Sequence, residues 1–345
     1  MNKKFLNKTA AGASLDDYEF NQVLYTGNSP ASNKSITGVG FKPDLIWVKS
    51  RTTAQNHIQS DAVTDDGTSN SLPILIPNTN ERQYTGSEAA GLYIRTLDSD
   101  GFSTGTSNQT GKANDDFAAW CWKASNSTET NNNGGKQSTV SASNGFSLIK
   151  YTGSSGGTQT VGHGMTSSPE MIIQKRTDAD EDWYIYVAPE IIDGTSTYYY
   201  LMFNTNAKAT TSDTAPTSTT FNPVSTTGDY VAYAFHSVSG KSKVGAYTVA
   251  NSSSDTVVTT GFAVNWLIIK RTDTAGTSWL LVDGARDTSN PITCYFSINS
   301  NHEEFCGGGT DLDFESTGFR INSTATWSGM NATGGVYFYF AQLAS

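Results

Sequence analysis

The residues best suited to binding chemistry form a basic pair that ends an apolar segment at three places along the chain. The three pairs are Lys49/Arg51, Lys175/Arg176 and Lys270/Arg271. A repeated cationic pair could hold an acidic partner or a glycan. It could instead end a buried strand and pair with acids in the following turn, such as Asp178 or Asp273. We favour this structural interpretation and keep Lys270 and Arg271 as candidate ligand-binding residues.

Two further features are candidates for ligand binding. Trp327 lies in a loop-like stretch at residues 325–329, where an indole ring could stack on a sugar. Asp283 and Arg286 lie in the segment 279–286. The corresponding segment 57–64 lacks the arginine, and the segment 183–190 lacks both residues. A strand-and-turn role explains this loss better than a binding site does, but Asp283 and Arg286 complete our set of candidate ligand-binding residues.

The sequence contains no recognisable catalytic motif, so we expect no catalytic residue, no metal and no other cofactor. The stretch 302–306 combines His302, two glutamates and Cys306 but lacks a distant fourth zinc ligand. The acidic run 178–182 lacks the turn glycine and the distal glutamate of a calcium loop. The acids at 311–315 are the only hint of a glycan-degrading enzyme. A glycosidase needs two carboxylates placed across a cleft, which the sequence does not show, so this is the weakest hypothesis.

Recurring landmarks indicate that these residues are held by three copies of one pattern. The tyrosines Tyr25, Tyr151 and Tyr247 are 126 and 96 positions apart, and the lysines of the basic pairs are 126 and 95 positions apart. An aromatic segment closes each copy, at 117–122, 230–235 and 337–341. The third has aromatic residues at consecutive positions, which indicates burial on both faces. Because unrelated motifs would not recur at nearly the same intervals, we interpret the landmarks as homologous strands.

The residue types in and between these landmarks favour strands. Large residues alternate in the first two closing segments, and Gly-Phe pairs at 101–102, 145–146, 261–262 and 318–319 are typical of turns that enter a strand. Abundant Thr, Ser, Asn and Gly disfavour helices. We therefore predict an all-β fold of tandem antiparallel β-sandwich or jelly-roll modules with a concanavalin-like pattern.

The landmarks also place the module boundaries. We predict an N-terminal arm at 1–17, module 1 at 18–124, a flexible linker at 125–142, module 2 at 143–238 and module 3 at 239–345. Each module is long enough to bury its own core. The linker is rich in Asn, Ser, Thr and Gly and has nothing to bury. No linker separates modules 2 and 3, so we expect these two to form a rigid pair. The arm carries Lys3, Lys4 and Lys8, which we assign to docking on a partner.

Charge and cysteine content narrow the range of partners. A net charge of −10 disfavours nucleic-acid binding, and no apolar stretch is long enough to span a membrane. The chain has only three cysteines, Cys121, Cys294 and Cys306. A disulfide framework normally uses a larger, even number of cysteines, so we do not expect one. Cys294 and Cys306 could pair within module 3, but we expect reduced thiols.

Several motifs together resemble a known family. The segments 40–43, 100–102, 119–124 and 279–286 resemble a repeat domain of predicted virion proteins of marine bacteriophages, labelled as tail or tail-fibre proteins or as a domain of unknown function. The resemblance covers nearly everything after residue 17. It implies a non-enzymatic structural protein on the virion surface, made in the host cytoplasm, that decorates the capsid or belongs to a tail appendage. Other virion proteins and copies of itself would be its partners. The alternative is a carbohydrate-binding adhesin that recognises a glycan on the host surface.

Overall fold

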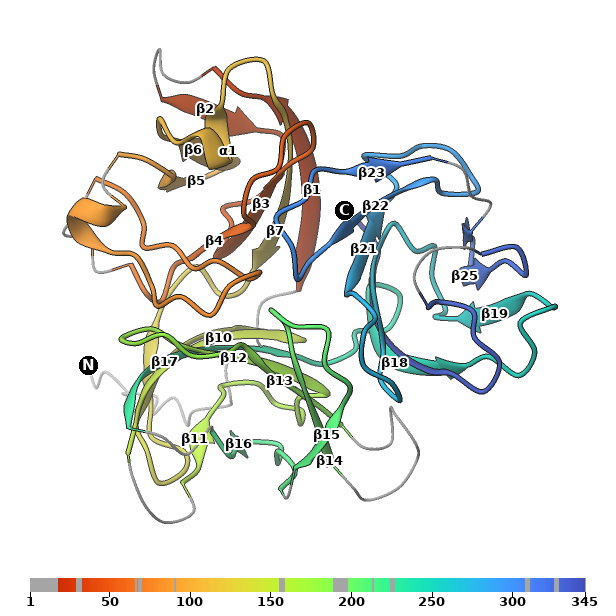
Figure 1. The fold of residues 1–345 in the computed structure, drawn as a ribbon. Helices are drawn as coiled ribbons and strands as arrows, with labels where there is room; N and C mark the ends of the chain where they lie inside the picture. The colour runs from red at the N-terminus through yellow and green to blue at the C-terminus, as the bar shows by residue number, and fades with distance from the viewer. Residues whose placement is uncertain are drawn as a thin grey trace, which may run out of the picture.

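The protein is built almost entirely of strands, arranged as three lobes around a common centre (Figure 1). The computed structural model describes residues 18–28, 33–65, 67, 70–89, 91–154, 159–188, 198–212, 214–223, 227–307, 311–325 and 329–344. The predicted all-β, antiparallel sandwich fold is confirmed. No helix in these ranges is long and apolar enough to cross a membrane.

Module 1 consists of a four-stranded sheet, a three-stranded sheet and short helical turns. Its strands are β1 (Glu19–Thr26), β2 (Lys34–Thr37), β3 (Leu45–Ser50), β4 (Ile58–Asp61), β5 (Ile94–Asp98), β6 (Gly101–Thr104) and β7 (Asp116–Lys123), and its helical turns are η1 (Gly86–Glu88) and α1 (Asn108–Gly111). The larger sheet has the order β1-β7-β3-β4 and the smaller one β2-β6-β5.

Module 2 repeats this plan with a wider sheet. Its strands are β10 (Phe146–Gly153), β11 (Val161–Gly162), β12 (Met171–Arg176), β13 (Tyr184–Val187), β14 (Tyr198–Met202), β15 (Thr210–Ser212), β16 (Thr220–Phe221) and β17 (Gly228–Phe235). The large sheet runs β15-β14-β13-β12-β17-β10 and continues into two further strands beside β10, and β11 pairs with β16.

The segment 125–142, which we predicted to be a flexible linker, supplies the two remaining strands of that sheet. β8 (Glu129–Asn131) pairs with β9 (Ser138–Ser143), and β9 pairs with β10. The prediction was wrong because the segment does have something to bury. Val140 is fully buried and Asn131 is 8% exposed. The polar composition of this segment is therefore that of strands at the edge of a sheet and not that of a linker.

Module 3 has a six-stranded and a three-stranded sheet. Its strands are β18 (Ser242–Thr248), β19 (Thr256–Thr259), β20 (Trp266–Arg271), β21 (Leu280–Asp283), β22 (Cys294–Ser297), β23 (Phe305–Cys306), β24 (Leu312–Glu315), β25 (Gly318–Ile321) and β26 (Val336–Gln342). The sheets run β18-β26-β20-β21-β22-β23 and β19-β25-β24.

The repeated landmarks occupy equivalent strands, as predicted. The aromatic closing strands β7, β17 and β26 lie inside the three large sheets. Each pairs on one side with the tyrosine strand (β1, β10 or β18) and on the other with the strand at whose end the basic pair lies (β3, β12 or β20), although in β3 the second residue, Arg51, comes just after the strand. The strand registers match as well. The lysine of the basic pair lies opposite the second residue of the aromatic closing segment in each module, with the pairs Lys49–Ala118, Lys175–Val231 and Lys270–Phe338.

The hydrophobic cores differ from the prediction of one separate core per module. Each module does bury a core between its large and small sheets. The opposite faces of the three large sheets also pack against one another in a shared central core. In β26, Tyr337 and Tyr339 face the core of module 3 while Phe338 and Phe340 face the shared core. The inferred burial of this strand on both faces is thus confirmed.

The shared core contains a small apolar cavity of about 20 Å³. It is lined by residues of all three modules, including Trp47, Trp122, Tyr233, Trp266 and Phe340. Five of the seven tryptophans are among the largest fully buried side chains. Because their rings fill the centre, the sheets form one body around it.

Candidate functional site

Three equivalent hydrogen bonds close the modules into a ring. In each, a backbone N–H of one module donates to the carbonyl of the residue that follows the basic-ended strand of the next module. They are Gln83 N to Thr177 O at 3.0 Å, Ala209 N to Thr272 O at 2.9 Å, and Glu304 N to Arg51 O at 3.0 Å. The order of contacts is module 1 to 2, 2 to 3 and 3 to 1, so the contacts are cyclic and close after three modules.

The segments that supply these donors share a motif that our sequence reasoning missed. Each contains Asn, then Thr or Ser, then Asn, at 78–80, 204–206 and 299–301. The first asparagine accepts a hydrogen bond at Oδ1 from the backbone N–H of the residue before the neighbouring strand: His57 to Asn78 at 2.9 Å, Trp183 to Asn204 at 3.0 Å, and Trp279 to Asn299 at 2.9 Å. The asparagines are 126 and 95 positions apart, the same spacing as the basic pairs, and this spacing could have revealed them.

The aromatic residue at this position reaches into the preceding module. Trp183 Nε1 donates to Ile76 O at 3.2 Å and to Thr79 O at 3.1 Å, and Trp279 Nε1 donates to Met202 O at 2.9 Å. In module 1 the residue is His57, whose ring lies edge-on to Phe296 of module 3. Burial lowers the pKa of His57 well below its usual value, and the charge of Lys49 acts in the same direction. The imidazole is therefore neutral and fills an interface position.

A second set of equivalent positions pairs donors with acids across the junctions. Tyr233 Oη donates to Asp61 Oδ2 at 2.8 Å, and Trp120 Nε1 donates to Asp283 Oδ2 at 3.0 Å. At the third junction the matching residues are Phe340 and Val187, both buried in the shared core. Where the acid is replaced by valine, the donor is thus replaced by phenylalanine. This matching indicates a role in joining modules.

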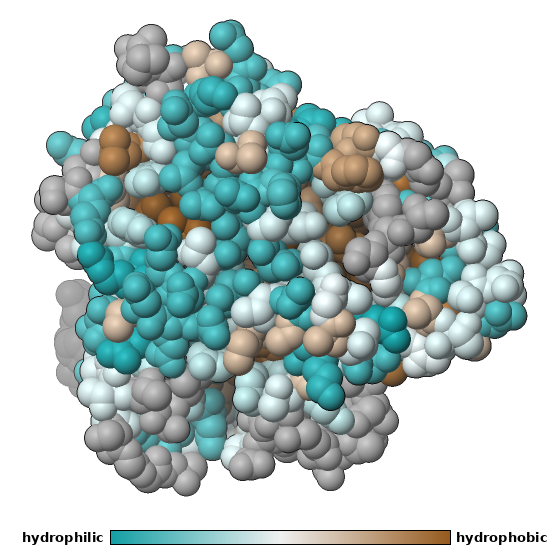
Figure 2. Space-filling model, viewed as in Figure 1, coloured by the Kyte–Doolittle hydropathy of each residue, from teal (hydrophilic) through white to brown (hydrophobic). Residues whose placement is uncertain are grey.

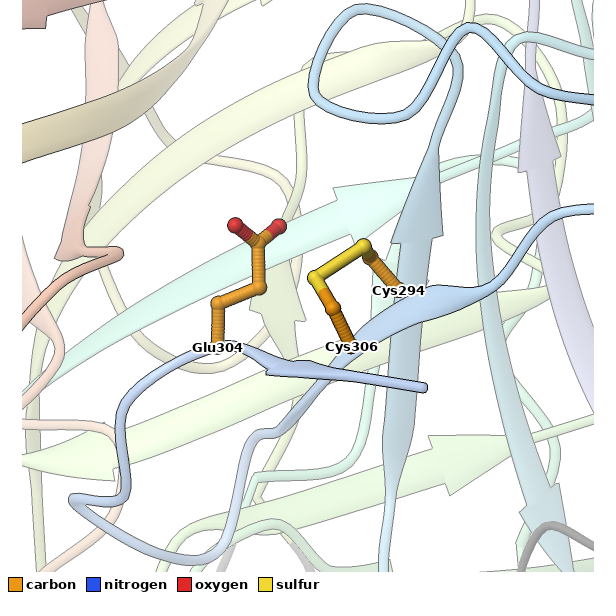
Figure 3. Close-up of side chains that lie close together, drawn as sticks. All are labelled: Cys294, Glu304 and Cys306. Atoms are coloured by element: carbon orange, nitrogen blue, oxygen red, sulfur yellow. A yellow bond between two sulfur atoms is a disulfide. The ribbon is translucent and has the colours of Figure 1, made fainter. Parts of the chain in front are cut away.

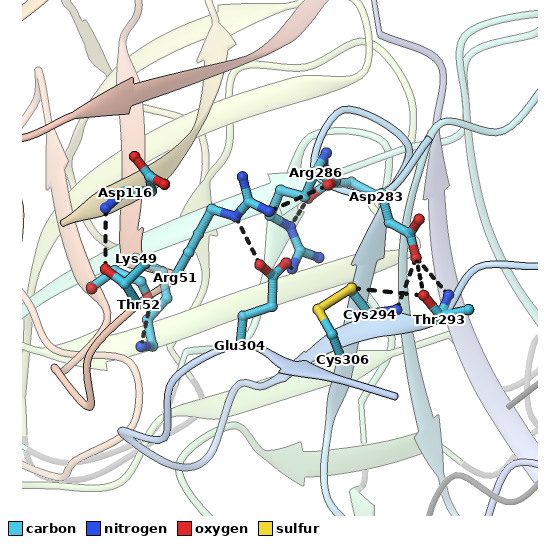
Figure 4. A network of polar contacts seen from close by, with 12 residues as sticks. Lys49, Arg51, Thr52, Asp116, Asp283, Arg286, Thr293, Cys294, Glu304 and Cys306 are labelled. Carbon is cyan, nitrogen blue, oxygen red and sulfur yellow. Dashed lines mark hydrogen bonds and ion pairs between the residues drawn. A yellow bond between two sulfur atoms is a disulfide. The ribbon is translucent and has the colours of Figure 1, made fainter. Parts of the chain in front are cut away.

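The junction between modules 3 and 1 carries a buried charge network (Figure 4). Arg286 Nε lies 2.5 Å from Asp283 Oδ2, and both side chains are completely buried. Glu304 receives Arg286 on one oxygen and Arg51 Nε on the other, the latter at 2.8 Å. The Arg286 guanidinium also lies 4.3 Å from the centre of the Phe296 ring. Arg51 belongs to module 1, so the network binds the two modules.

The lysines of the basic pairs are all fully buried. Lys49 Nζ lies 5.1 Å from the centre of the Phe296 ring, Lys175 donates to Glu181 O at 2.8 Å, and Lys270 donates to Thr277 O at 2.6 Å. Burial lowers the pKa of Lys49 to about 7 and those of Lys175 and Lys270 to about 8. Lys175 also donates to Asn80 O of module 1 at 3.2 Å. These amines therefore serve as internal hydrogen-bond donors.

The predicted ligand-binding residues are thus placed in the interior or paired. Lys270, Asp283 and Arg286 are buried, and our prediction that they bind a ligand needs correction because their polar groups face partners within the chain. Arg271 pairs with Asp273 at 2.9 Å, and Arg176 pairs with Asp178 at 2.7 Å. The structural interpretation of the basic pairs is confirmed for these two. Trp327, Lys3, Lys4 and Lys8 lie outside the described residues.

The cysteines also differ from the prediction. Cys294 and Cys306 form a disulfide between β22 and β23, whereas Cys121 is a buried free thiol whose pKa is raised by burial. The expectation of reduced thiols was wrong for the first two because β22 and β23 place them directly opposite each other. Glu304 lies beside this disulfide (Figure 3). With both sulfurs joined and Glu304 held by two arginines, this group is not available as a metal site.

The acidic stretches have partners inside the protein as well. Asp180 accepts a hydrogen bond from the Arg82 backbone at 2.9 Å, and Asp182 accepts one from Asn204 at 2.8 Å. Arg320 pairs with Asp313 at 3.0 Å and with Glu315 at 3.1 Å. These carboxylates hold loops and paired strands in place.

A polar cleft in module 1 is a different kind of site, because two cations in its lining, Lys42 and Arg95, form no ion pair among the described residues. Its volume is about 420 Å³, within the usual range for small-molecule pockets. The lining residues are Lys42, Asp44, Ala62, Asp65, Leu72, Arg95, Thr96, Leu97, Asn126, Ser127 and Thr128. Asp44 Oδ2 accepts hydrogen bonds from Ala124 N at 2.7 Å and Asn126 N at 3.1 Å, which folds the chain that leaves β7 over the cleft. Sequence reasoning missed this site, since its residues come from distant loops.

The face of the molecule in Figure 2 is largely hydrophilic, with small separate hydrophobic patches. The large apolar side chains that are most exposed among the described residues are Leu24, Leu92, Val257, Phe305 and Leu343. They come from different modules. The module 1 cleft is therefore the strongest candidate binding site in the described part of the chain.

The comparisons with known proteins identify a family and no function. No curated protein and no solved structure matches the chain. One family model, a domain of unknown function, matches residues 16–344 and treats all three modules as a single unit. That extent agrees with a shared core and cyclic junctions, and the chain belongs to this family, DUF7483.

Proposed function

We propose that this chain is a non-enzymatic structural component on the exterior of a bacteriophage particle, either a capsid decoration or part of a tail appendage. The motifs that resemble phage virion proteins motivate the proposal. The observation that carries it is the closed ring, in which three equivalent junctions commit their polar groups to internal partners. Such a body offers outer surfaces for assembly.

The small sheets β2-β6-β5, β11-β16 and β19-β25-β24 lie at the periphery of the three lobes (Figure 1). Three similar peripheral surfaces around one centre suit a partner of threefold or quasi-threefold symmetry, because each lobe can meet an equivalent site. Other virion proteins are the proposed partners.

Cryo-electron microscopy of intact particles, with this chain carrying a short peptide epitope bound by an antibody fragment, tests the proposal. Added density at regular exterior positions is the expected result. Particles that lack the chain, or that hold it only in the interior, would refute the proposal. A variant lacking residues 1–17 tests docking through Lys3, Lys4 and Lys8, and undiminished incorporation would show that the arm is not the docking element.

A second candidate function is binding of a host surface glycan, with the chain acting as an adhesin. The polar cleft of module 1 favours it, since hydroxyl, amide and charged groups line one cavity. Both functions are compatible in one exterior protein.

A further inference from the structure

We propose that the module 1 cleft binds an acidic saccharide, with the sugar carboxylate held by Arg95 and Lys42. This inference rests on the second candidate function, glycan binding, and names its ligand class. It does not require a particular position on a particle.

The first step concerns Arg95. The sequence contains seven arginines, and six of them form ion pairs with carboxylates of the chain. Arg95 is the exception among the described residues, and it lines the cleft. Among the residues that the structure describes, its one hydrogen bond runs from Nη1 to Asn33 Oδ1 at 2.9 Å. Its guanidinium thus keeps donors that no carboxylate of the described chain occupies, and this fork geometry matches a carboxylate.

The second step concerns Lys42, which lines the same cleft from the loop before β3. It forms no ion pair among the described residues, although its charge helps to lower the pKa of Asp44 against the raising effect of burial. Two carboxylates, Asp44 and Asp65, line the same cleft, but both accept backbone hydrogen bonds, Asp44 from Ala124 and Asn126 and Asp65 from Gly67. Neither forms an ion pair with Lys42 or Arg95 among the described residues, so the two cations are left to meet a negatively charged group of a ligand.

The third step concerns the remaining lining groups, which favour a sugar over a simple anion. Ser127 and Thr128 offer hydroxyl groups, and Asn126 offers an amide. Asp65 accepts from the Gly67 backbone with Oδ1 at 3.0 Å, and its Oδ2 can accept a hydrogen bond from a sugar hydroxyl. Leu72 and Leu97 supply apolar surface for a ring face. Groups that both donate and accept suit a polyhydroxylated ligand, and the cations then select the acidic one.

The test uses the full chain and isothermal titration calorimetry with three probes: D-glucuronate, D-glucose and acetate. Glucose lacks the carboxylate of glucuronate, and acetate lacks the hydroxyl groups. We expect glucuronate to bind more tightly than either, with an affinity that falls as salt concentration rises. In Arg95→Met the dissociation constant should rise about tenfold, the loss of one charge-assisted contact.

Arg82→Met is the matched control, because Arg82 pairs with Glu88 outside the cleft at 2.7 Å and is partly exposed, as Arg95 is. Lys42→Met, at an exposed position, provides a second variant if Arg95→Met does not fold. Equal binding of glucose and glucuronate, equal binding of acetate, unchanged affinity in both cleft variants, or no binding of any probe would each overturn the proposal. None of these results bears on where the protein lies on a particle, so failure here is distinct from failure of the structural role.

Discussion

Removal of the Arg286 guanidinium should destabilise the protein more than loss of any surface ion pair. Arg286 joins Asp283 and Glu304, and its side chain has no exposed area. In Arg286→Met most of the side-chain volume remains. Asp283 keeps hydrogen bonds from Trp120 and from the residue 286 backbone, but its charge stays buried without a cation beside it.

The magnitude follows from this geometry. Breaking a buried ion pair by removing one partner costs about 3–5 kcal/mol, because the other charge is left uncompensated. At about 2 °C per kcal/mol for a large domain, the melting temperature should fall by about 6–10 °C. Arg176→Met is the matched control, since its pair with Asp178 is 25% and 40% exposed and should contribute at most about 1 kcal/mol.

Urea unfolding followed by tryptophan fluorescence measures both variants. The double variant Asp283→Asn/Arg286→Met removes the buried charge but keeps an acceptor for Trp120, so it should be more stable than Arg286→Met alone. A loss in Arg286→Met no larger than that in Arg176→Met would refute the reasoning. So would a double variant whose loss equals the sum of the two single losses, because the two positions would then be uncoupled.

Three further outcomes are expected. Because the modules share one core, calorimetry of the whole chain should give a single cooperative transition, whereas separate transitions for the modules would contradict the shared core. Reduction of the Cys294–Cys306 disulfide, whose cysteines are 12 positions apart, should lower the free energy of unfolding by about 3 kcal/mol. The stability of the variant Cys294→Ala/Cys306→Ala should not change on addition of reductant. An equal response of both proteins would refute this. Burial lowers the pKa of Lys270 to about 8 in the folded protein, from 10.5 for an unperturbed lysine. Between pH 8 and 10 the unfolded state therefore binds more protons than the folded state, and stability should rise with pH, by up to about 1.4 kcal/mol per pH unit for this residue. Urea titrations at pH 8 and 9.5 should show a smaller rise in Lys270→Met, and an equal rise would exclude the lysine as the cause.

Sequence reasoning predicted the strands that carry the landmarks because local patterns determine them. The basic-ended strand and the aromatic closing strand have period-two or fully apolar patterns, and their spacing identified the repeat before any contact was known. The pairing of Arg271 with Asp273 followed from the same local reasoning, since only one residue separates them.

The arrangement of the modules could not be predicted in the same way. Trp183 and Trp279 each stand beside an apolar strand, but nothing in their local sequence says that their indole N–H groups donate to the preceding module. A face of a sheet that packs on a neighbouring module has the same apolar pattern as one that packs within its own module. The error at 125–142 had a related cause, because strands at a sheet edge can be rich in Ser and Thr.

The placement of the charge network and the disulfide follows from the order of the modules in the chain. Modules 1 and 2, and modules 2 and 3, are joined by the backbone, which keeps each pair at a high effective concentration. Modules 3 and 1 have no such connection, so contact between them closes the ring at a greater cost in entropy. This is the junction where Glu304 receives both Arg51 and Arg286, and where the disulfide fixes β23, which begins at the next residue. If the network compensates for the missing connection, then joining the two termini of the ring through an engineered linker should reduce the destabilisation caused by Arg286→Met. An unchanged loss in the circularised protein would show that the network serves some purpose other than ring closure.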